Sequence, residues 1–435
     1  MNAEERQRTL REVVLAGNCS HPIRLSGEMV NLTTGEVGQS SLRISCKDRR
    51  HVVCPSCSYL YRTDAWILVS TGLVGGKGTP EAVGTHHRLF ITVTAPSFGS
   101  VHTIKSRGGC VGRSNAGLAR SRDVCGHGRA RSCGRRHEEG SSELGRPLCD
   151  QCFDYEGAVL WNAHASKLWN NTIQTIRRSL ATAGGLNQRN LKSVAQVHYL
   201  KVAEMQRRGL VHFHLVLRAD GPTDVGEPTP EWMTIELLRQ VVSQGIRKST
   251  AVAPDGQIFR WGRRLDIQEL DSDPHNGAAV SSYLAKYVTK TTDGSTELAH
   301  RFRSRRQIES LVDDPHLRTL AVTTWNLASR TELERLHLRD RAHTFGFTGL
   351  PITKSRDYST TFEALRGIRA AFMAVHNDSD PIEGSFRYEG RGYDNPRSAE
   401  LAEVFFNMRR ELRQEAAQAR RIAKRDQFGD SHEAL

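Results

Sequence analysis

A pair of histidines in one predicted β-hairpin constrains this chain more than any other feature of its sequence. The segment Val202–Leu217 is VAEMQRRGLVHFHLVL, in which two apolar runs flank the polar MQRRG and Gly209 is available for a positive φ. His212 and His214 are two residues apart, so in a strand both imidazoles point to one face. Phe213 then points to the opposite face, toward a core. The pattern predicts a hairpin with one apolar face and one imidazole-bearing face.

The imidazole-bearing face predicts a metal site. Glu204 is the nearest carboxylate on the partner strand, and a turn near 207–209 brings it to the face of His212 and His214. Two imidazoles and one carboxylate can hold a divalent cation and leave positions open for substrate oxygens. The alternative is a pair of hydrogen-bonded polar residues in a strand.

Length and charge limit the function classes. The 435 residues can form two or three domains, and the 38% hydrophobic and 25% charged contents suit a soluble globular protein. The net charge of +13 favours a polyanionic partner, most simply nucleic acid, over a merely basic protein. The sequence has no N-terminal apolar segment and no apolar run of about 18 residues, so we expect a cytoplasmic protein without a membrane partner.

Residues 1–75 are predicted to be an N-terminal Cys-rich zinc-binding segment. Cysteines without a signal peptide favour thiolate metal ligands over disulfides. Four thiolates complete a tetrahedral structural Zn²⁺ site, and the CPSC knuckle at 54–57 is the strongest part of this pattern. The predicted ligands are Cys19, Cys46, Cys54 and Cys57. A redox-active CxxC pair is the alternative, but no βαβ pattern surrounds it. A short helix is expected over 64–73.

Residues 105–152 are predicted to be a basic, zinc-binding insert. Nine basic residues and one acidic residue lie between Lys105 and Arg136. The favoured ligands of a second Zn²⁺ are Cys125, Cys133, Cys149 and Cys152, and the possible substitutes are Cys110, His127 and His137. Metal binding would supply folding free energy that so small an apolar core cannot, and a disordered basic loop is the alternative. The two sites predict about two zinc ions per chain.

The pattern of elements predicts an α+β fold. Strands are expected at 88–95, 194–204, 210–217 and 258–270, and helices at 155–183, 231–249 and 277–291. The order strand, helix, strand, strand, helix, strand, helix fits a split βαβ layout with the histidine hairpin central to an antiparallel sheet. We expect this domain to cover residues 76–300, including the insert. Trp161 and Trp169 are expected in its core.

The helix predicted at 277–291 carries two tyrosines on one face. Tyr283 and Tyr287 are four residues apart, and each is followed three residues later by a lysine, Lys286 or Lys290. A phenol with an ordinary pKa of about 10 is a weak nucleophile at neutral pH, and a nearby cation favours the phenolate. Attack on a phosphodiester also needs the phosphate charge to be offset, which bound Mg²⁺ or Mn²⁺ can do. An amphipathic surface is the alternative for the tyrosine face alone.

Together these motifs resemble the replication initiators of actinomycete plasmids and integrative conjugative elements, which belong to the HUH endonuclease superfamily. HFH at 212–214 resembles the HUH motif, and RLFITVTAPSF at 88–98 resembles the strand motif that precedes it in rolling-circle initiators. YLAKY at 283–287 resembles the two-tyrosine motif of the phage branch, and Glu204 has the placement of the acidic ligand in several viral relatives. The likeness covers roughly residues 45–300, and the Cys-bearing insert departs from minimal viral versions.

The resemblance implies a rolling-circle initiator that nicks one strand of origin DNA. A tyrosine would attack the strand, become joined to the 5′ phosphate and leave a 3′ hydroxyl for the host polymerase. The second tyrosine would act at termination, when the displaced circle is resealed. The partners implied are single-stranded and duplex origin DNA, and the absence of a Walker A motif implies a separate host helicase.

Residues 301–435 are predicted to form a basic, mainly helical C-terminal region. Its first segment is RFRSRR, and the arginines expected to contact DNA phosphates are Arg301, Arg303, Arg305 and Arg306. Helices are expected within 307–343, 359–375 and 399–424. The region can bind the origin duplex, or it can be a solvated tail or a dimer helix.

Two other functions compete with a nickase. A zinc-containing DNA-binding regulator without catalysis needs only the cysteines and the charge, and leaves the His pair and the two YxxK motifs unexplained. An HUH-type transposase is the nearest enzymatic alternative. A metallohydrolase of the HxHxDH type is excluded because Leu215-Val-Leu follows His214.

Overall fold

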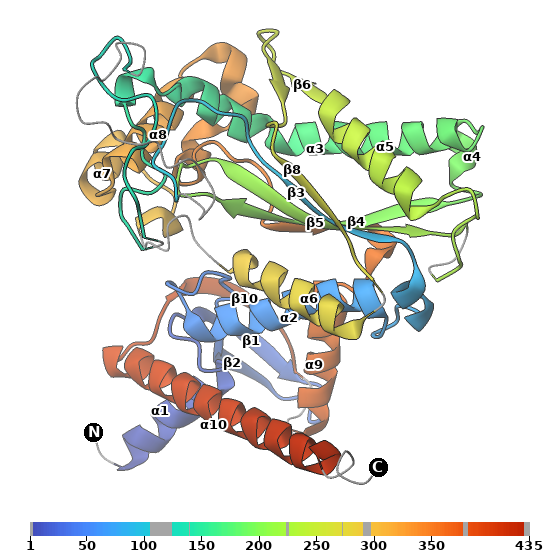
Figure 1. Ribbon diagram of the computed structural model, residues 1–435. Helices are drawn as coiled ribbons and strands as arrows, with labels where there is room; N and C mark the ends of the chain where they lie inside the picture. Colours follow the sequence, from blue (N-terminus) through green and yellow to red (C-terminus); the bar gives the residue numbers. More distant parts are fainter. Residues whose placement is uncertain are drawn as a thin grey trace. The chain divides into compact units, whose positions relative to one another are not determined.

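The computed structural model describes residues 3–104, 124–138, 140–222, 226–271, 273–289, 297–376 and 382–429. The chain forms two compact units (Figure 1): the first comprises Met1–Thr63 and Arg366–Leu435, and the second comprises Asp64–Leu365. Both contain helices and an antiparallel sheet, so the predicted α+β class is confirmed. The grouping differs from the segments 1–75, 76–300 and 301–435, because residues 301–365 join the histidine hairpin and the two chain ends join each other.

The first unit is built on a three-stranded sheet of order β10-β1-β2, with both pairings antiparallel. Strand β10 from the C-terminal region pairs with β1, which explains why residues far apart in the sequence share this unit. Its elements are α1 (Ala3–Leu15), β1 (Ile23–Asn31), β2 (Val37–Ile44), β10 (Ile382–Arg391) and α10 (Pro396–Gly429). Helices α2 (Pro55–Val74) and α9 (Phe362–His376) contain the two points at which the chain is divided.

The second unit contains the elements that carry the predicted site. Its strands are β3 (Arg88–Val93), β4 (Gln196–Met205), β5 (Val211–Asp220), β6 (Thr250–Val252), β7 (Ile258–Arg260), β8 (Leu265–Glu269) and β9 (Ile352–Lys354). Its α-helices are α3 (Tyr155–Ala183), α4 (Gln188–Leu191), α5 (Ile235–Lys248), α6 (Pro274–Val288), α7 (Arg305–Leu311) and α8 (Pro315–Leu327). Short 3₁₀ helices are η1 (Glu81–Thr85), η2 (Asp150–Cys152), η4 (Glu297–Ala299), η5 (Thr331–Leu336), η6 (Leu338–Thr344) and η7 (Arg356–Tyr358).

The histidine hairpin occupies the middle of the main sheet. The strand order is β8-β3-β5-β4-β9, with every pairing antiparallel. The predicted central position of the hairpin is therefore confirmed. Because side chains alternate along a strand, β5 turns Phe213, Leu215 and Leu217 into the main hydrophobic core and turns its two histidines to the opposite face.

Helices α3 and α5 cover the apolar face of this sheet, while α6 contacts β4 and carries the tyrosines to the other face (Figure 1). Helix α3 has the predicted bounds: the Asp154 side chain caps its N-terminus by accepting from the Gly157 amide, and the Gly184 amide donates to Leu180 at its end. The core positions of Trp161 and Trp169 are also confirmed, since both are at most 1% exposed.

Several sequence-based boundaries are corrected. The strand expected at 258–270 is two strands, β7 and β8, because the chain turns at Gly262, whose amide donates to the Thr94 carbonyl. A Cβ at Gly262 would lie 2.5 Å from the Ala95 carbonyl oxygen, so this close approach requires glycine. The helix expected at 64–73 begins at Pro55, directly after Cys54. The sequence patterns do not predict strands β1, β2, β6, β9 and β10.

A buried ion pair lies on the histidine face, farther along β5. Arg218 is 0% exposed and donates through Nε and Nη2 to Asp220, at 2.7 Å in both cases. It also donates to the carbonyls of Gly72 and Tyr358, and thereby joins the sheet to α2 and η7. The Asp220 carboxylate lies 2.7 Å from Nδ1 of His86 as well. These contacts satisfy charges that would otherwise be costly to bury.

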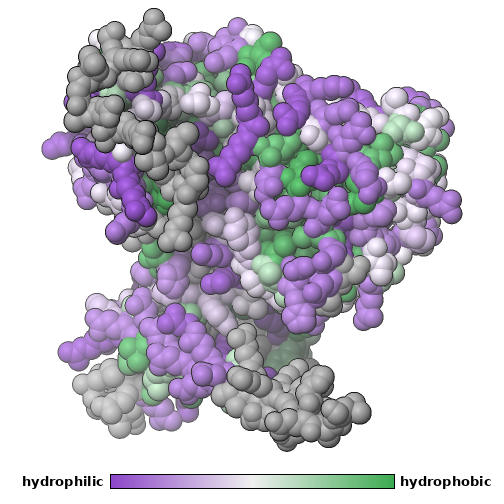
Figure 2. Space-filling view, in the orientation of Figure 1, coloured by the Kyte–Doolittle hydropathy of each residue, from purple (hydrophilic) through white to green (hydrophobic). Residues whose placement is uncertain are grey.

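Hydrophilic residues cover most of the face seen in Figure 2, with hydrophobic residues in smaller groups. Within the described residues, every helix is too short or too polar to span a membrane.

Candidate active site

The turn between β4 and β5 fixes which side chains meet on the histidine face. Gly209 has φ +72° and donates its amide to the Gln206 carbonyl, while the Gln206 amide donates to the Leu210 carbonyl. The resulting register places Glu204 directly opposite His212. The expectation that Glu204 shares a face with both histidines is therefore met by the backbone pairing.

His214 is the point at which the predicted residues meet. Its Nε2 lies 3.3 Å from Oε2 of Glu204 and 3.4 Å from the hydroxyl of Tyr283. Its Nδ1 lies 3.1 Å from Oγ1 of Thr92, a residue of β3. The imidazole is buried, so these polar contacts hold its ring in one orientation. The ring of Phe90 stacks beside it with centroids 6.1 Å apart.

His212 has a different environment. Its Nδ1 lies 3.0 Å from Nε2 of Gln206, whose Oε1 accepts from Nε of Arg208 at 2.9 Å. Its own Nε2 is buried and has no hydrogen-bond partner among the described residues. Burial, with the nearby charges of His214, Arg208 and Arg264, lowers the pKa of His212 to about 3. The imidazole is therefore neutral at pH 7, the protonation state that a metal ligand requires.

The proton position on His212 depends on Gln206. With the amide NH₂ directed at Nδ1, as the Arg208 contact favours, Nδ1 accepts and the proton is on Nε2. Ligation of a metal by Nε2 needs the proton on Nδ1 and the amide oxygen directed at it. Gln206 thus controls which nitrogen of His212 can act as a ligand.

Helix α6 brings both predicted phenols to His214. The ring of Tyr283 meets the imidazole edge to face, with centroids 5.1 Å apart, and the ring of Tyr287 stacks on it at 5.3 Å. The helix begins at Pro274 with the Asp273 side chain as its cap. Because the phenols are one turn apart, a single imidazole contacts both of them.

The pKa of Tyr283 differs from the sequence-based expectation. Burial raises it, and the hydrogen bond with Tyr287 and the charges of Tyr287 and Glu204 raise it further. A cation beside this phenol, from a lysine or from a bound metal, would act against these contributions and favour the phenolate. Lys286 is exposed on α6, and Lys290 lies outside the described residues.

A cavity of about 460 Å³ opens at this cluster. Its lining includes Glu204, His212, His214 and Tyr283. It also includes residues that the sequence analysis did not assign to the site: Phe90, Thr92, Thr94, Gln206, Arg264, Asp266 and Gln268. Asp266 faces Thr92 in the β3–β8 pairing, and the alternating pattern LDIQE of β8 is the signal that places it on this face.

A second, larger cavity of about 870 Å³ adjoins the first, since Thr94, Gln206 and Arg264 line both. Its cationic lining residues are Arg207, Arg208, Arg260, Arg263 and Arg264. Burial lowers the pKa of Arg208 to about 10, so its guanidinium still carries a charge at pH 7. This concentration of arginines makes the cavity suited to an anionic, phosphate-bearing ligand.

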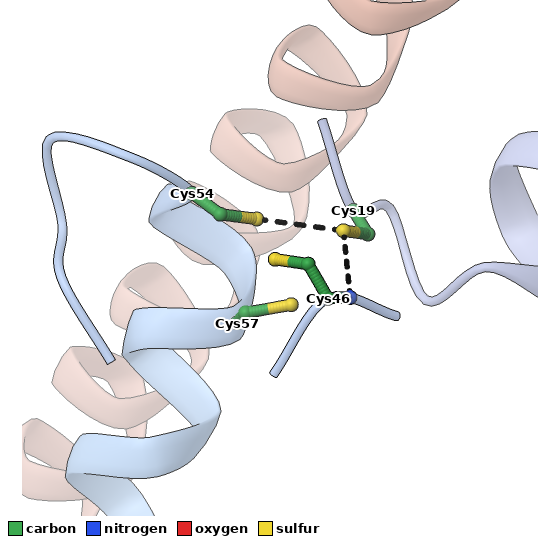
Figure 3. Close-up of side chains that lie close together, drawn as sticks. All are labelled: Cys19, Cys46, Cys54 and Cys57. Atoms are coloured by element: carbon green, nitrogen blue, oxygen red, sulfur yellow. Dashed lines mark hydrogen bonds between the residues drawn. The ribbon is translucent and has the colours of Figure 1, made fainter. Parts of the chain in front are cut away.

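The predicted N-terminal cysteine group is assembled in the first unit (Figure 3). Cys54 and Cys57 lie at the start of α2, and the four ligand atoms of Cys19, Cys46, Cys54 and Cys57 lie within 4.8 Å of one another. The sulfurs of Cys19 and Cys54 are 3.7 Å apart. A contact with Cys19 lowers the pKa of the Cys54 thiol and raises the pKa of the Cys57 thiol. These side chains can hold a metal such as zinc.

The second predicted cysteine group is corrected in one ligand. Cys125, Cys149 and Cys152 converge with His127, not with Cys133, and the four ligand atoms lie within 4.8 Å of one another. His127 Nδ1 is 3.3 Å from the Cys152 sulfur. The loop places Cys133 beside two other histidines, His102 and His137, and His127 is one of the three substitute ligands that the sequence left open. This set can also hold a metal such as zinc; Cys110 lies outside the described residues.

The ligand atoms of His212, His214 and Glu204 do not all lie within 4.8 Å of one another, whereas those of three other groups of described residues do. Nε2 of His214 nevertheless lies 3.3 Å from Oε2 of Glu204.

The predicted DNA-binding arginines precede and begin α7. All four are exposed: Arg301, Arg303, Arg305 and Arg306. Arg301 lies 3.7 Å from Asp340, and Arg305 is bonded to Glu309 at 2.8 Å. Such exposed pairs contribute little to stability and can open for a phosphate.

The chain is similar to known replication initiator proteins. The family described as "RepSA: Replication initiator protein, pSAM2" matches residues 5–406. A Streptomyces ambofaciens protein named "Replication initiator protein" is 34% identical over 439 residues, which covers 95% of this chain and 90% of that protein. No solved structure matches.

Proposed function

This chain belongs to the RepSA family of replication initiator proteins, and we propose that it initiates rolling-circle replication as a tyrosine endonuclease of the HUH superfamily. In this proposal it nicks one strand of origin DNA, keeps the 5′ end as a phosphotyrosine adduct and reseals the strand at termination. The host polymerase extends the 3′ hydroxyl, and a host helicase unwinds the duplex.

One observation carries the proposal: the Tyr283 hydroxyl lies 3.4 Å from Nε2 of His214 in a cavity that Glu204 and His212 also line. Glu204, His212 and His214 come from the β4–β5 hairpin, whereas Tyr283 comes from α6 and is 69 residues from His214 in the sequence. If each of these residues had only a structural role, there would be no reason for all of them to line the same cavity. A phenol, a carboxylate and imidazoles at one opening are the groups needed for attack on a phosphodiester.

The side chains present fit a divalent cation, Mg²⁺ or Mn²⁺. His212 is neutral, and its buried Nε2, which has no partner among the described residues, can act as a ligand once the Gln206 amide oxygen is directed at Nδ1. His214 already contacts the Glu204 carboxylate. Imidazole nitrogens with a carboxylate oxygen form a donor set that such cations accept, and Asp266 adds a second carboxylate to the lining. When bound, the cation would supply positive charge to a nonbridging phosphate oxygen.

We propose that Tyr283 makes the first attack. It lines the cavity, whereas Tyr287 is not among the lining residues and stacks on the imidazole. The phenolic oxygen forms the bond to phosphorus while the bond to the 3′ oxygen breaks. The phenol gives up its proton, for which His214, itself in contact with Glu204, is the adjacent acceptor, and the leaving 3′ oxygen takes up a proton.

The arginine-lined cavity is the proposed path of the DNA strand. Five arginines border it, and it adjoins the tyrosine cavity, with which it shares three lining residues. Phosphates held there would position the scissile bond near Tyr283. The exposed arginines before α7 are proposed as further phosphate contacts.

The test is adduct formation on a single-stranded origin oligonucleotide with Mn²⁺. The wild-type chain is expected to give a protein–DNA adduct that survives denaturing electrophoresis, with the nucleotide mapped to Tyr283 by mass spectrometry. Tyr283→Phe should lose this adduct, Tyr287→Phe should retain it, and the exposed Tyr388→Phe serves as the matched control. An adduct that persists when both Tyr283 and Tyr287 are phenylalanine would refute the proposal. DNA binding without any wild-type adduct would favour a noncatalytic regulator.

A further inference from the structure

We propose that His102, Cys133 and His137 form a third zinc site, in addition to the two groups that contain the CxxC knuckles. The three ligand atoms lie within 4.8 Å of one another. His102 Nδ1 is 3.0 Å from His137 Nε2, and the Cys133 sulfur is 3.5 Å from the first nitrogen and 3.2 Å from the second. The spacing of the cysteines predicts a different group for Cys133 and gives no signal for His102.

These separations suit a shared zinc ion. Tetrahedral Zn²⁺ with Zn–N of about 2.0–2.1 Å and Zn–S of about 2.3 Å keeps two nitrogens about 3.4 Å apart and a nitrogen and a sulfur about 3.5 Å apart. The observed distances lie within a few tenths of an ångström of these values. The three side chains leave one tetrahedral position, which water can fill.

A second observation separates a metal site from a cluster of hydrogen bonds. His137 directs Nε2 at Cys133 and Nδ1 at Glu143, whose Oε2 is 3.4 Å away. Arg135 donates to the same carboxylate at 2.9 Å and holds it in place. A carboxylate at Nδ1 keeps the imidazole proton there and leaves the lone pair of Nε2 directed at the cluster. This is the arrangement found around zinc-bound histidines, so Glu143 is the positioning residue of the site.

The backbone brings the ligands together from two segments. His102 follows β3, and its amide donates to the Arg146 carbonyl while its own carbonyl accepts from the Gly145 amide. Cys133 and His137 lie in the loop that returns to this pairing. The loop has few buried apolar side chains, Leu144 being one, so a metal bound here would supply much of its stability.

The same loop packs against the tip of the histidine hairpin. Arg207 donates to the Ser141 carbonyl at 2.9 Å, and a Cβ at Gly145 would lie 2.7 Å from the Arg207 backbone. His102 and Gly145 also line the arginine-rich cavity. The third zinc would therefore hold one wall of that cavity. This inference concerns metal binding and does not depend on the proposed tyrosine chemistry.

The test compares the zinc content of the purified full-length chain and its variants by mass spectrometry of the elements. The wild-type chain is expected to contain three zinc ions, His137→Ala two, and the exposed-histidine control His300→Ala three. Two zinc ions retained in His137→Ala, with unchanged circular dichroism, would show that the other groups remain folded. An equal zinc content in wild type and His137→Ala would overturn the proposal.

Glu143→Gln tests the positioning role separately. Loss of the carboxylate is expected to weaken binding of one zinc ion by about 10- to 100-fold, measured by competition with a chelator, while the other two are unchanged. If Glu143 only pairs with Arg135 on the surface, the zinc affinity will not change.

Discussion

Lys201 should make the second unit more stable at high pH than at neutral pH. This side chain is on β4 but faces the core, is 3% exposed, and its Nζ lies 3.9 Å from the centre of the Phe213 ring. Burial lowers the pKa of Lys201 from its ordinary value of 10.5 to about 7. Between these values the folded chain binds fewer protons than the unfolded chain, so the free energy of unfolding rises with pH.

The magnitude follows from the two pKa values. At 1.36 kcal/mol for each unit of pKa, keeping this lysine buried costs about 4 kcal/mol at pH 7 and about 2 kcal/mol at pH 9. Lys201→Met removes the cost and retains an apolar chain of similar length. Allowing about 1–2 kcal/mol for the lost contact with the Phe213 ring, we expect the variant to be more stable by about 2–3 kcal/mol at pH 7.

Urea unfolding followed by tryptophan fluorescence measures this effect in the right unit, because all six tryptophans lie within Asp64–Leu365. The stability advantage of Lys201→Met should shrink by about 2 kcal/mol between pH 7 and pH 9. The exposed Lys192→Met should show the same pH dependence as wild type. A constant difference between Lys201→Met and wild type across this range would refute the reasoning.

Two further predictions concern the histidine face. Gln206→Glu should bind Mn²⁺ about tenfold more tightly, because a carboxylate can accept from both Arg208 and Nδ1 of His212 and leave Nε2 free for the ion. A Mn²⁺ titration measures the affinity, and Gln268→Glu controls for the added negative charge in the same cavity. An affinity equal to that of wild type would contradict this prediction. Asp220→Asn should destabilise the second unit by about 3–5 kcal/mol, because Arg218 stays buried without its counter-ion. Burial favours a raised pKa for Asp220, but hydrogen bonds from His86 and Arg218 outweigh burial and lower the pKa. The stabilisation is therefore complete above the unfolded pKa of about 3.9, and it is lost as the pH falls through the pKa of the folded chain. Acid unfolding of wild type and Asp220→Asn should therefore converge at low pH, and parallel curves would argue against this pairing.

Local patterns determined the elements that carry the candidate site. The alternation around His212 and His214 predicted a strand with one polar face, and the spacing of Tyr283 and Tyr287 predicted two phenols on one face of a helix. These features depend on periods of two and 3.6 residues, which any short segment expresses without its neighbours. The N-terminal cysteine group was predictable for a related reason, since its CxxC pair fixes two ligands within one turn.

The residues that surround those elements depend on how separate strands, helices and loops pack together. Thr92 and Asp266 join the site because β3 and β8 pair beside β5 in one register, and sequence spacing contains no record of that pairing. Cys133 meets His102 because the loop that contains Cys133 folds back onto the segment after β3, and the number and spacing of cysteines do not predict this contact. The sequence by itself thus determined which side chains share a strand or a helix face. Contacts between separate elements depend on the packing of the whole unit. The neighbours of His214, the arginine-lined cavity and the ligands of the third metal group are therefore defined only in the folded structure.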